Sequence, residues 1–257
     1  MKSNHLAVHR YGQGDPVIFL HGFFSDHRLW EPIIQTLSSD YQCLAVDLPG
    51  HGESGPWRGD WPDLLEQLDH LIASLSVPCH LIGYSMGARV LGQMLTRLGP
   101  PIHTAILISP TAGFQPIAAR QRRLRDHQLA AQINHQTITE SADYWSQQPI
   151  FYGQDMSSES ALQRQHRIRC SQEPRHLAFA LRTLGSGTCA INDPLVRGQS
   201  IHLLSGERLA LDVERTQALA QQWPSAHTTW LRQNGHNPII EDPIGLSAQF
   251  KGLLALN

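Results

Sequence analysis

The chain has 257 residues, a length that sheet-centred α/β folds often reach as a single domain around one core. Its formal net charge is −2 and 16% of its residues are charged, so it lacks the basic excess that binding to nucleic acid or to an anionic membrane requires. No apolar run approaches the roughly 18 residues of a spanning helix, which argues against membrane insertion. The four cysteines are too scattered for a disulfide framework or a CxxC metal pair, which favours free thiols and a cytoplasmic protein.

Short apolar runs with strand character recur along the chain, at 17–20, 41–46, 80–83, 104–108, 201–204 and 227–231. Most are nearly continuously apolar, as strands buried on both faces should be. Helical patterns fit residues 30–37, 64–75, 86–98, 213–222 and 243–254. This alternation predicts an α/β fold with a doubly wound, mostly parallel sheet.

The alternation stops between about residues 114 and 184, where helical sequence rich in Gln and Arg shows no convincing strand. We therefore expect one domain over residues 1–257 with a helical cap inserted at about 114–184. Nine of the 20 Lys and Arg residues fall in this cap, namely Arg120, Arg122, Arg123, Arg125, Arg164, Arg167, Arg169, Arg175 and Arg182. Because guanidinium groups bind carboxylates bidentately, those that face inward would select a small polycarboxylate substrate, and the others would form a solvated helix face.

Gly83-Tyr84-Ser85-Met86-Gly87 follows an apolar run and opens a helical pattern. A G-x-S-x-G motif between a strand and a helix is typical of the nucleophile elbow of the α/β-hydrolase fold, in which the serine projects at the carboxyl edge of the sheet. This fold places the triad in the order Ser, acid, His, and His236 lies after the last predicted strand, where the base belongs. We predict that Ser85 and His236 are catalytic.

Backbone amides near Ser85 can stabilise a developing oxyanion. His21-Gly22-Phe23 ends the first predicted strand, so we expect the amides of Phe23 and Met86 to form the oxyanion hole. The turn from Asp47 to Gly52 follows the next strand and is interpreted as scaffold, with His51 structural.

The acid of the triad is missing from its usual place. In the turn after the strand at 201–204, Leu209 occupies the position where a Gly-x-x-Asp pattern would have aspartate. Asp212 and Glu207 are the alternatives, but Asp212 precedes a predicted helix and is better explained as its N-cap. Without an acid, a carbonyl or a water would have to set the tautomer of the His236 imidazole.

Over nearly the whole chain these residues resemble the 2-succinyl-6-hydroxy-2,4-cyclohexadiene-1-carboxylate synthases of menaquinone biosynthesis. The segments that carry the resemblance, beside the elbow, are 21–23, 47–52, 83–89, 120–126, 145–151, Arg169 and 235–237. The resemblance implies an α/β-hydrolase fold and a carbon–oxygen lyase that eliminates pyruvate after Ser85 and His236 remove a proton. It also implies a substrate-binding set of Tyr84, Arg89, Arg122, Trp145 and Arg169.

Three residues depart from the family pattern: Leu209 replaces the triad aspartate, Ala88 replaces a glycine and Ser146 replaces an aromatic residue. Two other functions therefore stay open. One is a serine hydrolase acting on a small anionic ester or a carbon–carbon bond, and the other is a non-catalytic binding protein on a hydrolase scaffold. We expect no metal and no organic cofactor, since no His/Cys/Asp cluster has the spacing of a metal site.

Overall fold

The computed structural model describes residues 5–255 except 76, 98, 190, 192–194 and 196–198. Seven strands of this part of the chain form one sheet in the order β1-β3-β2-β4-β5-β6-β7. β1 runs antiparallel to β3, and every other neighbouring pair is parallel. The strands are β1 (Val8–Tyr11), β2 (Asp15–Leu20), β3 (Tyr41–Val46), β4 (Cys79–Tyr84), β5 (Ile102–Ile108), β6 (Ser200–Gly206) and β7 (His227–Leu231).

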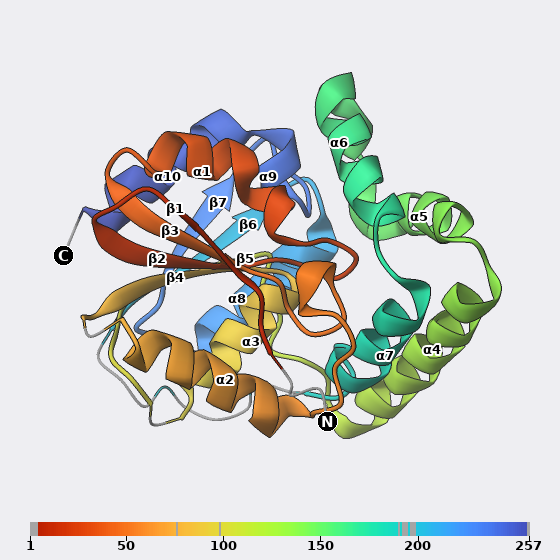
Figure 1. Ribbon diagram of the computed structural model, residues 1–257. Coiled ribbons are helices and arrows are strands. Elements are labelled where there is room, and N and C mark those ends of the chain that lie inside the picture. Colours follow the sequence, from red (N-terminus) through yellow and green to blue (C-terminus); the bar gives the residue numbers. More distant parts are fainter. Residues whose placement is uncertain are drawn as a thin grey trace.

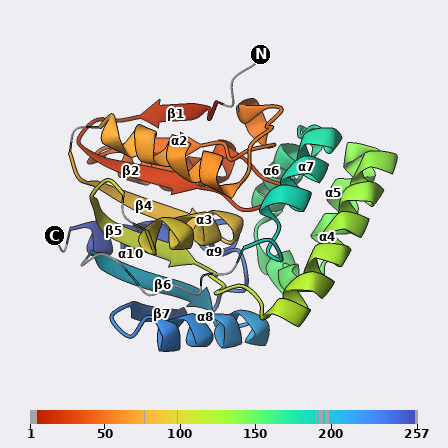
Figure 2. The same cartoon turned by 90° about the horizontal axis from the view of Figure 1, so that it is seen from below.

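Helices cover both faces of the sheet (Figures 1 and 2). α1 and α10 lie on one face, and α2, α3 and α8 lie on the other. Their bounds are α1 (Glu31–Leu37), α2 (Trp61–Ala73), α3 (Met86–Leu95), α8 (Ala210–Gln222) and α10 (Pro243–Leu254), with the short α9 (Pro238–Glu241) before α10. Within the described ranges, no helix is long and apolar enough to cross a lipid bilayer.

The main elements of the sheet were predicted from the sequence, but several boundaries differ. Trp30 belongs to a 3-10 turn, η1 (His27–Trp30), rather than to α1. α3 ends at Leu95, earlier than predicted, and Leu98 lies outside the described residues. α8 begins at Ala210, three residues before the predicted start. β1 was not predicted, because a short edge strand whose residues are half-buried or exposed shows no clear periodicity.

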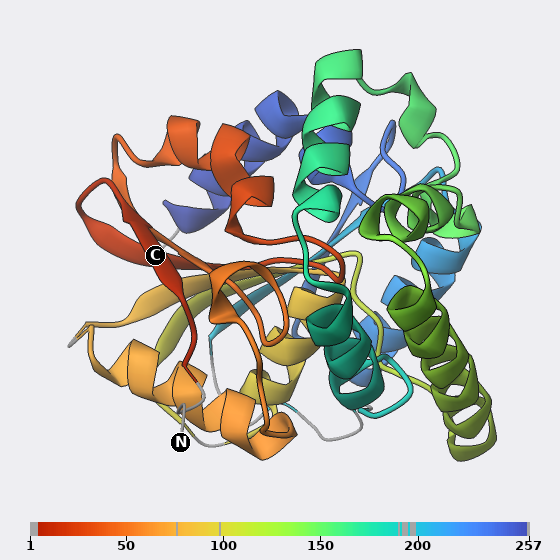
Figure 3. The same ribbon diagram turned by 45° about the vertical axis from the view of Figure 1, so that its right-hand side comes forward.

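In the described part of the chain between β5 and β6, four helices extend along one end of the sheet (Figure 3). They are α4 (Pro116–His135), α5 (Ile138–Ser146), α6 (Glu159–Cys170) and α7 (Pro174–Leu184), with the 3-10 turns η3 (Pro149–Phe151) and η4 (Gln154–Met156) between α5 and α6. We use the name cap for residues 114–184. α4 packs along α7, and a small apolar cluster in the cap includes Ala130, Ile133 and Leu177 together with Phe24 of the sheet domain.

Two larger apolar clusters form the core, one on each face of the sheet. The central strands are buried on both faces, so they hold the loops at their carboxyl ends in fixed positions. The cap lies over these carboxyl ends (Figure 2). In open α/β sheets this edge is where ligands bind.

Candidate active site

Ser85 lies in a sharp turn between β4 and α3. Its φ of +51° falls in the left-handed region, which a serine rarely adopts. The turn is held by hydrogen bonds from the Ser85 amide to the Ile108 carbonyl (2.9 Å) and from the Gly87 amide to the His21 carbonyl (3.0 Å). Gly87 must be glycine because a Cβ there would lie 2.1 Å from the Leu20 carbonyl oxygen. The strained backbone directs the serine hydroxyl away from the sheet.

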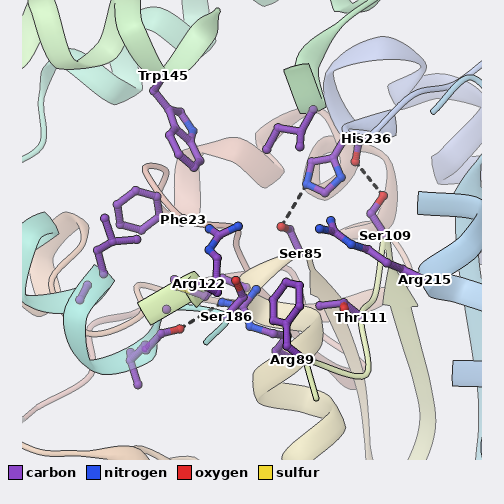
Figure 4. A pocket seen from close by; sticks show the side chains of 17 residues that line it. Phe23, Ser85, Arg89, Ser109, Thr111, Arg122, Trp145, Ser186, Arg215 and His236 are labelled. Atoms are coloured by element: carbon purple, nitrogen blue, oxygen red, sulfur yellow. Dashed lines mark hydrogen bonds between the residues drawn. The ribbon is translucent and has the colours of Figure 1, made fainter. Parts of the chain in front are cut away.

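His236 connects the serine to a buried carboxylate. Its Nε2 lies 3.1 Å from Ser85 Oγ, and its Nδ1 lies 2.6 Å from Asp212 Oδ2. Asp212 is fully buried. The loop that carries His236 is fixed by Ser109, whose hydroxyl donates to the His236 carbonyl (2.8 Å; Figure 4). The three side chains have the connectivity of a Ser-His-Asp triad.

The interpretation of Asp212 as a helix N-cap is wrong. Leu209 is the N-cap of α8, and Asp212 is the third residue of the helix, with its side chain turned toward His236. Glu207, the other alternative, is exposed to solvent. Asp212 also benefits from its place in the first turn, where the helix dipole stabilises a negative charge.

The loop from His21 to Phe24 presents backbone amides to Ser85. His21 Nδ1 donates to the Gly22 carbonyl (2.7 Å), and its Nε2 accepts from the Leu48 amide (2.9 Å). His51 Nε2 accepts from the Phe24 amide (3.1 Å), and burial lowers the pKa of His51 to about 3. Both imidazoles are thus held as neutral orienting groups. Among the described residues, neither the Phe23 nor the Met86 amide has an acceptor, so both donors are available.

A cavity of about 90 Å³ lies between Ser85 and the cap (Figure 4). Its lining includes predicted residues from the sheet domain and from the cap, namely Phe23, Ser85, Met86, Arg89, Arg122, Trp145 and His236. Pockets for drug-sized ligands usually enclose about 300–1,000 Å³. At about 90 Å³, this cavity is smaller than that range.

Two of the predicted arginines bring positive charge to this cavity. Arg89 is buried on α3, and its Nη2 donates to the Leu184 carbonyl (3.0 Å) while its buried Nε has no acceptor among the described residues. Burial and then the charge of Arg122 lower the pKa of Arg89 to about 10. Arg122 reaches the cavity from α4, where its Nε donates to Asp126 Oδ1 (2.8 Å). Free donors on these two groups can bind anions.

Trp145 forms the wall opposite Ser85 (Figure 4). Its ring packs edge-on against Phe23 with 5.1 Å between centroids, and its buried indole N–H has no acceptor in the described part of the chain. This contact joins the cap to the loop that carries the Phe23 amide. A displacement of Trp145 with the cap would therefore change the packing around the Phe23 amide of the predicted oxyanion hole.

The structure does not bring Tyr84 and Arg169 into this cavity. Both line a smaller pocket behind Phe23. Arg169 is almost fully buried, donates to Ser146 Oγ (2.5 Å) and lies over the Phe151 ring at 4.8 Å. Ser146, one of the departures from the family pattern, thus holds a guanidinium in the cap. Ala88, another departure, is fully buried in the core on α3.

Sequence reasoning missed Arg215, which lines the same cavity from α8. Arg215 lies three residues after Asp212, a spacing that puts two residues on the same face of a helix. This spacing could have indicated Arg215 only if α8 had been predicted to begin before Asp212. Phe114, Thr111 and Ser186 also line the cavity and were not predicted, because they lie in loops without a motif.

A cluster of possible metal ligands was also not predicted. Ring nitrogens of His9 and His27 and a carboxylate oxygen of Asp47 lie within 4.8 Å of one another. The Asp47 oxygens already accept from the backbone amides of His27 (2.7 Å) and Glu53 (2.8 Å). Although burial opposes it, the hydrogen bond to Asp47 raises the pKa of His27. His9 Nε2 on β1 lies 3.2 Å from Asp47 Oδ2, which ties β1 to the turn after β3, so the cluster supports the scaffold.

Comparison with known proteins identifies the family. The model of the family described as "Alpha/beta hydrolase family" matches residues 17–249. A 2-succinyl-6-hydroxy-2,4-cyclohexadiene-1-carboxylate synthase from Salmonella newport (strain SL254) is 32% identical over 260 residues, covering 97% of this chain and 98% of the relative. The chain belongs to this synthase family. Another relative of the same name, from Citrobacter koseri, is 29% identical over 95% of each chain.

Solved structures agree with this membership of the synthase family. MenH from S. aureus matches with a TM-score of 0.88 and 25% identity, covering 98% of each chain. A thermophilic esterase from Thermogutta terrifontis, solved with malate bound, matches with a TM-score of 0.82 at 21% identity, a likeness that shows the fold alone. The predicted α/β-hydrolase fold and the predicted resemblance to the synthase family are both confirmed. The protein is an enzyme of this fold.

Proposed function

We propose that this protein eliminates pyruvate from 2-succinyl-5-enolpyruvyl-6-hydroxy-3-cyclohexene-1-carboxylate and so forms 2-succinyl-6-hydroxy-2,4-cyclohexadiene-1-carboxylate in menaquinone biosynthesis. The observation that carries the proposal is one cavity that combines the Ser85–His236 pair (3.1 Å) with Arg89 and Arg122. The pair supplies a base, and the arginines suit a substrate with three carboxylates. Membership of the synthase family supports this assignment.

The structures of substrate and product define the bonds that change. The proton leaves the ring carbon that bears the succinyl ketone, and the electrons of that C–H bond form a double bond to the next ring carbon. The ring double bond shifts by one position and expels the enolpyruvyl oxygen, which breaks the C–O bond. The leaving group is the enolate of pyruvate, which takes up one proton at its methylene carbon and becomes pyruvate. This proton balances the one removed from the ring, so the reaction needs no oxidant, reductant or water.

Each residue of the site then has a role in proton transfer or charge stabilisation. Ser85 and His236 act together as the base, and His236 holds the proton as an imidazolium. Asp212 fixes the imidazole tautomer and stabilises its positive charge. Negative charge develops on the ketone oxygen as the proton leaves, and the amides of Phe23 and Met86 stabilise it. Acyl-enzyme formation is not required.

The test is pyruvate release from the enolpyruvyl substrate, generated in situ by the preceding pathway enzyme and followed with lactate dehydrogenase and by diene absorbance. We expect turnover by the wild type and none above background for Ser85→Ala and His236→Ala. Ser74→Ala, at an exposed position after α2, is the matched control and should behave as the wild type. Folded wild-type protein that releases no pyruvate would refute the proposal.

Hydrolysis of a small anionic ester is the second candidate, because a complete hydrogen-bonded Ser-His-Asp arrangement is what acyl transfer requires. Burst release of p-nitrophenol from p-nitrophenyl succinate, lost in Ser85→Ala, would favour it over elimination. The third alternative, a non-catalytic binding protein, depended on a missing acid. The contact between Asp212 and His236 removes that reason.

A further inference from the structure

Arg215 reaches the active-site cavity from α8, a helix that carries no substrate-binding motif. It lies on α8, one turn after Asp212, and lines the cavity together with Ser85 and His236. Figure 4 shows its side chain extending from α8 toward Ser85. About a quarter of the side chain is exposed, so Arg215 is partly buried.

The guanidinium of the partly buried Arg215 has few partners in the described part of the protein. Its Nη1 lies 3.8 Å from Asp212 Oδ1, which is longer than a hydrogen bond. Phe114 provides a ring at 5.9 Å, near the limit of a cation–π contact. No hydrogen-bond acceptor for Arg215 is found among the described residues. Its five N–H donors are thus available to a ligand.

Three guanidinium groups approach the same cavity from three elements: Arg89 on α3, Arg122 on α4 and Arg215 on α8. Two carboxylates lie nearby: Asp126 Oδ1 accepts from Arg122, and Asp212 Oδ2 faces His236 Nδ1. Asp212 Oδ1 has no hydrogen-bond partner among the described residues and lies 3.8 Å from Arg215, so it offsets the charge of Arg215 without a hydrogen bond. Burial lowers the pKa of Arg215, and although Asp212 opposes this, the charge of Arg122 adds to it. An anion in the cavity would relieve the repulsion among the three cations.

We propose that Arg215 is a substrate-binding residue that takes one carboxylate of a tricarboxylate beside Ser85, with Arg89 and Arg122 taking the others. The identity of the substrate rests on the function proposed above, whereas the anion site rests on this geometry. Arg169 does not fill this role here, because Ser146 and Phe151 hold its guanidinium outside the cavity. Arg215 thereby sets specificity for the third negative charge.

A purely structural role, in which Arg215 neutralises Asp212, makes a different prediction. Loss of that role would disturb the His236 base and lower kcat whatever ligand is bound. Loss of a carboxylate contact would instead raise KM and weaken the binding of anions, with a smaller effect on kcat. A split between KM and kcat therefore separates the two roles.

The test compares wild type, Arg215→Gln and Arg215→Lys, with Arg208→Gln as the matched control. Arg208 is an exposed arginine just before α8 that does not line the cavity. The probe is propane-1,2,3-tricarboxylate, whose binding is measured by calorimetry and by competition with Ser85 labelling by a neutral fluorophosphonate. We expect Arg215→Gln to weaken binding at least tenfold, Arg215→Lys to weaken it less, and Arg208→Gln to leave it unchanged. Thermal melting confirms that each variant is folded.

Equal affinity in wild type and Arg215→Gln, or no binding by the wild type, would overturn the inference. A loss of kcat in Arg215→Gln with unchanged affinity would also overturn the inference, because that result shows that Arg215 neutralises Asp212 and does not bind the substrate. If the tricarboxylate binds through Arg215 but the wild type releases no pyruvate, the anion site stands and the proposed function fails. If pyruvate is released with the same KM by Arg215→Gln, the function stands and the inference fails.

Discussion

Replacement of Asp212 by asparagine tests whether the triad acid has moved into α8. The carboxylate lies 2.6 Å from His236 Nδ1 in a fully buried position. A hydrogen bond to a charged group of this kind contributes about 1.5–3 kcal/mol. An asparagine can also donate to Nδ1, which places the remaining imidazole hydrogen on Nε2 and removes the base that faces Ser85. Both effects together should lower kcat by about 10³–10⁴-fold, or about 4–5.5 kcal/mol.

The assay is pyruvate release under saturating substrate, with KM measured in parallel. KM should stay within about threefold, because Asp212 lies behind His236 and outside the cavity lining. Glu207→Gln, which changes the exposed acid before α8, is the control and should keep full activity. Leu209→Asp in the Asp212→Asn background asks whether an acid at the usual family position restores turnover. An Asp212→Asn variant that keeps more than about a tenth of kcat would show that our account of the triad is wrong.

Three further predictions concern stability. The folded protein holds His51 neutral with a pKa of about 3, whereas the unfolded chain takes up a proton below about pH 6.5. Wild type should therefore lose about 1.6 kcal/mol more than His51→Gln in urea unfolding between pH 6.5 and pH 5, and equal losses would contradict this. Gly87→Ala should lower the melting temperature because the new methyl group meets backbone, whereas Gly252→Ala on exposed helix should raise it slightly, and a reversed order would count against the argument. Ser146→Ala should cost about 1.5–3 kcal/mol in chemical unfolding by leaving the buried Arg169 guanidinium unpaired, and an unchanged midpoint would show that the contact contributes little.

The sequence was sufficient for the parts of the molecule that are governed by burial and by strong motifs. Strands such as β2 and β4 are buried on both faces, so they appear as continuous apolar runs. Ser85 was predictable because its turn requires glycines at fixed positions on either side. His236 was predictable because the chain order of the fold places the base after the last strand.

The sequence was insufficient where the outcome depends on a helix boundary or on contacts between distant elements. Ala210 and Leu211 are good helix formers, and α8 includes them without a side-chain cap. The preference of aspartate for N-caps therefore misplaced the start of α8. Contacts of Arg169 with Ser146 and Phe151 link residues of different cap segments, and no local pattern encodes them.

The helical position of the acid explains why loss of aspartate at position 209 is compatible with an intact triad. In an α-helix, residues three apart lie on nearly the same face, and each residue rises about 1.5 Å. Leu209 is the extended N-cap residue, whereas Asp212 lies in the first turn of α8, where its carboxylate meets His236. The same spacing carries Arg215 onto the face that borders the cavity. The acid that faces His236 and the arginine that lines the cavity are thus both presented by the first two turns of α8.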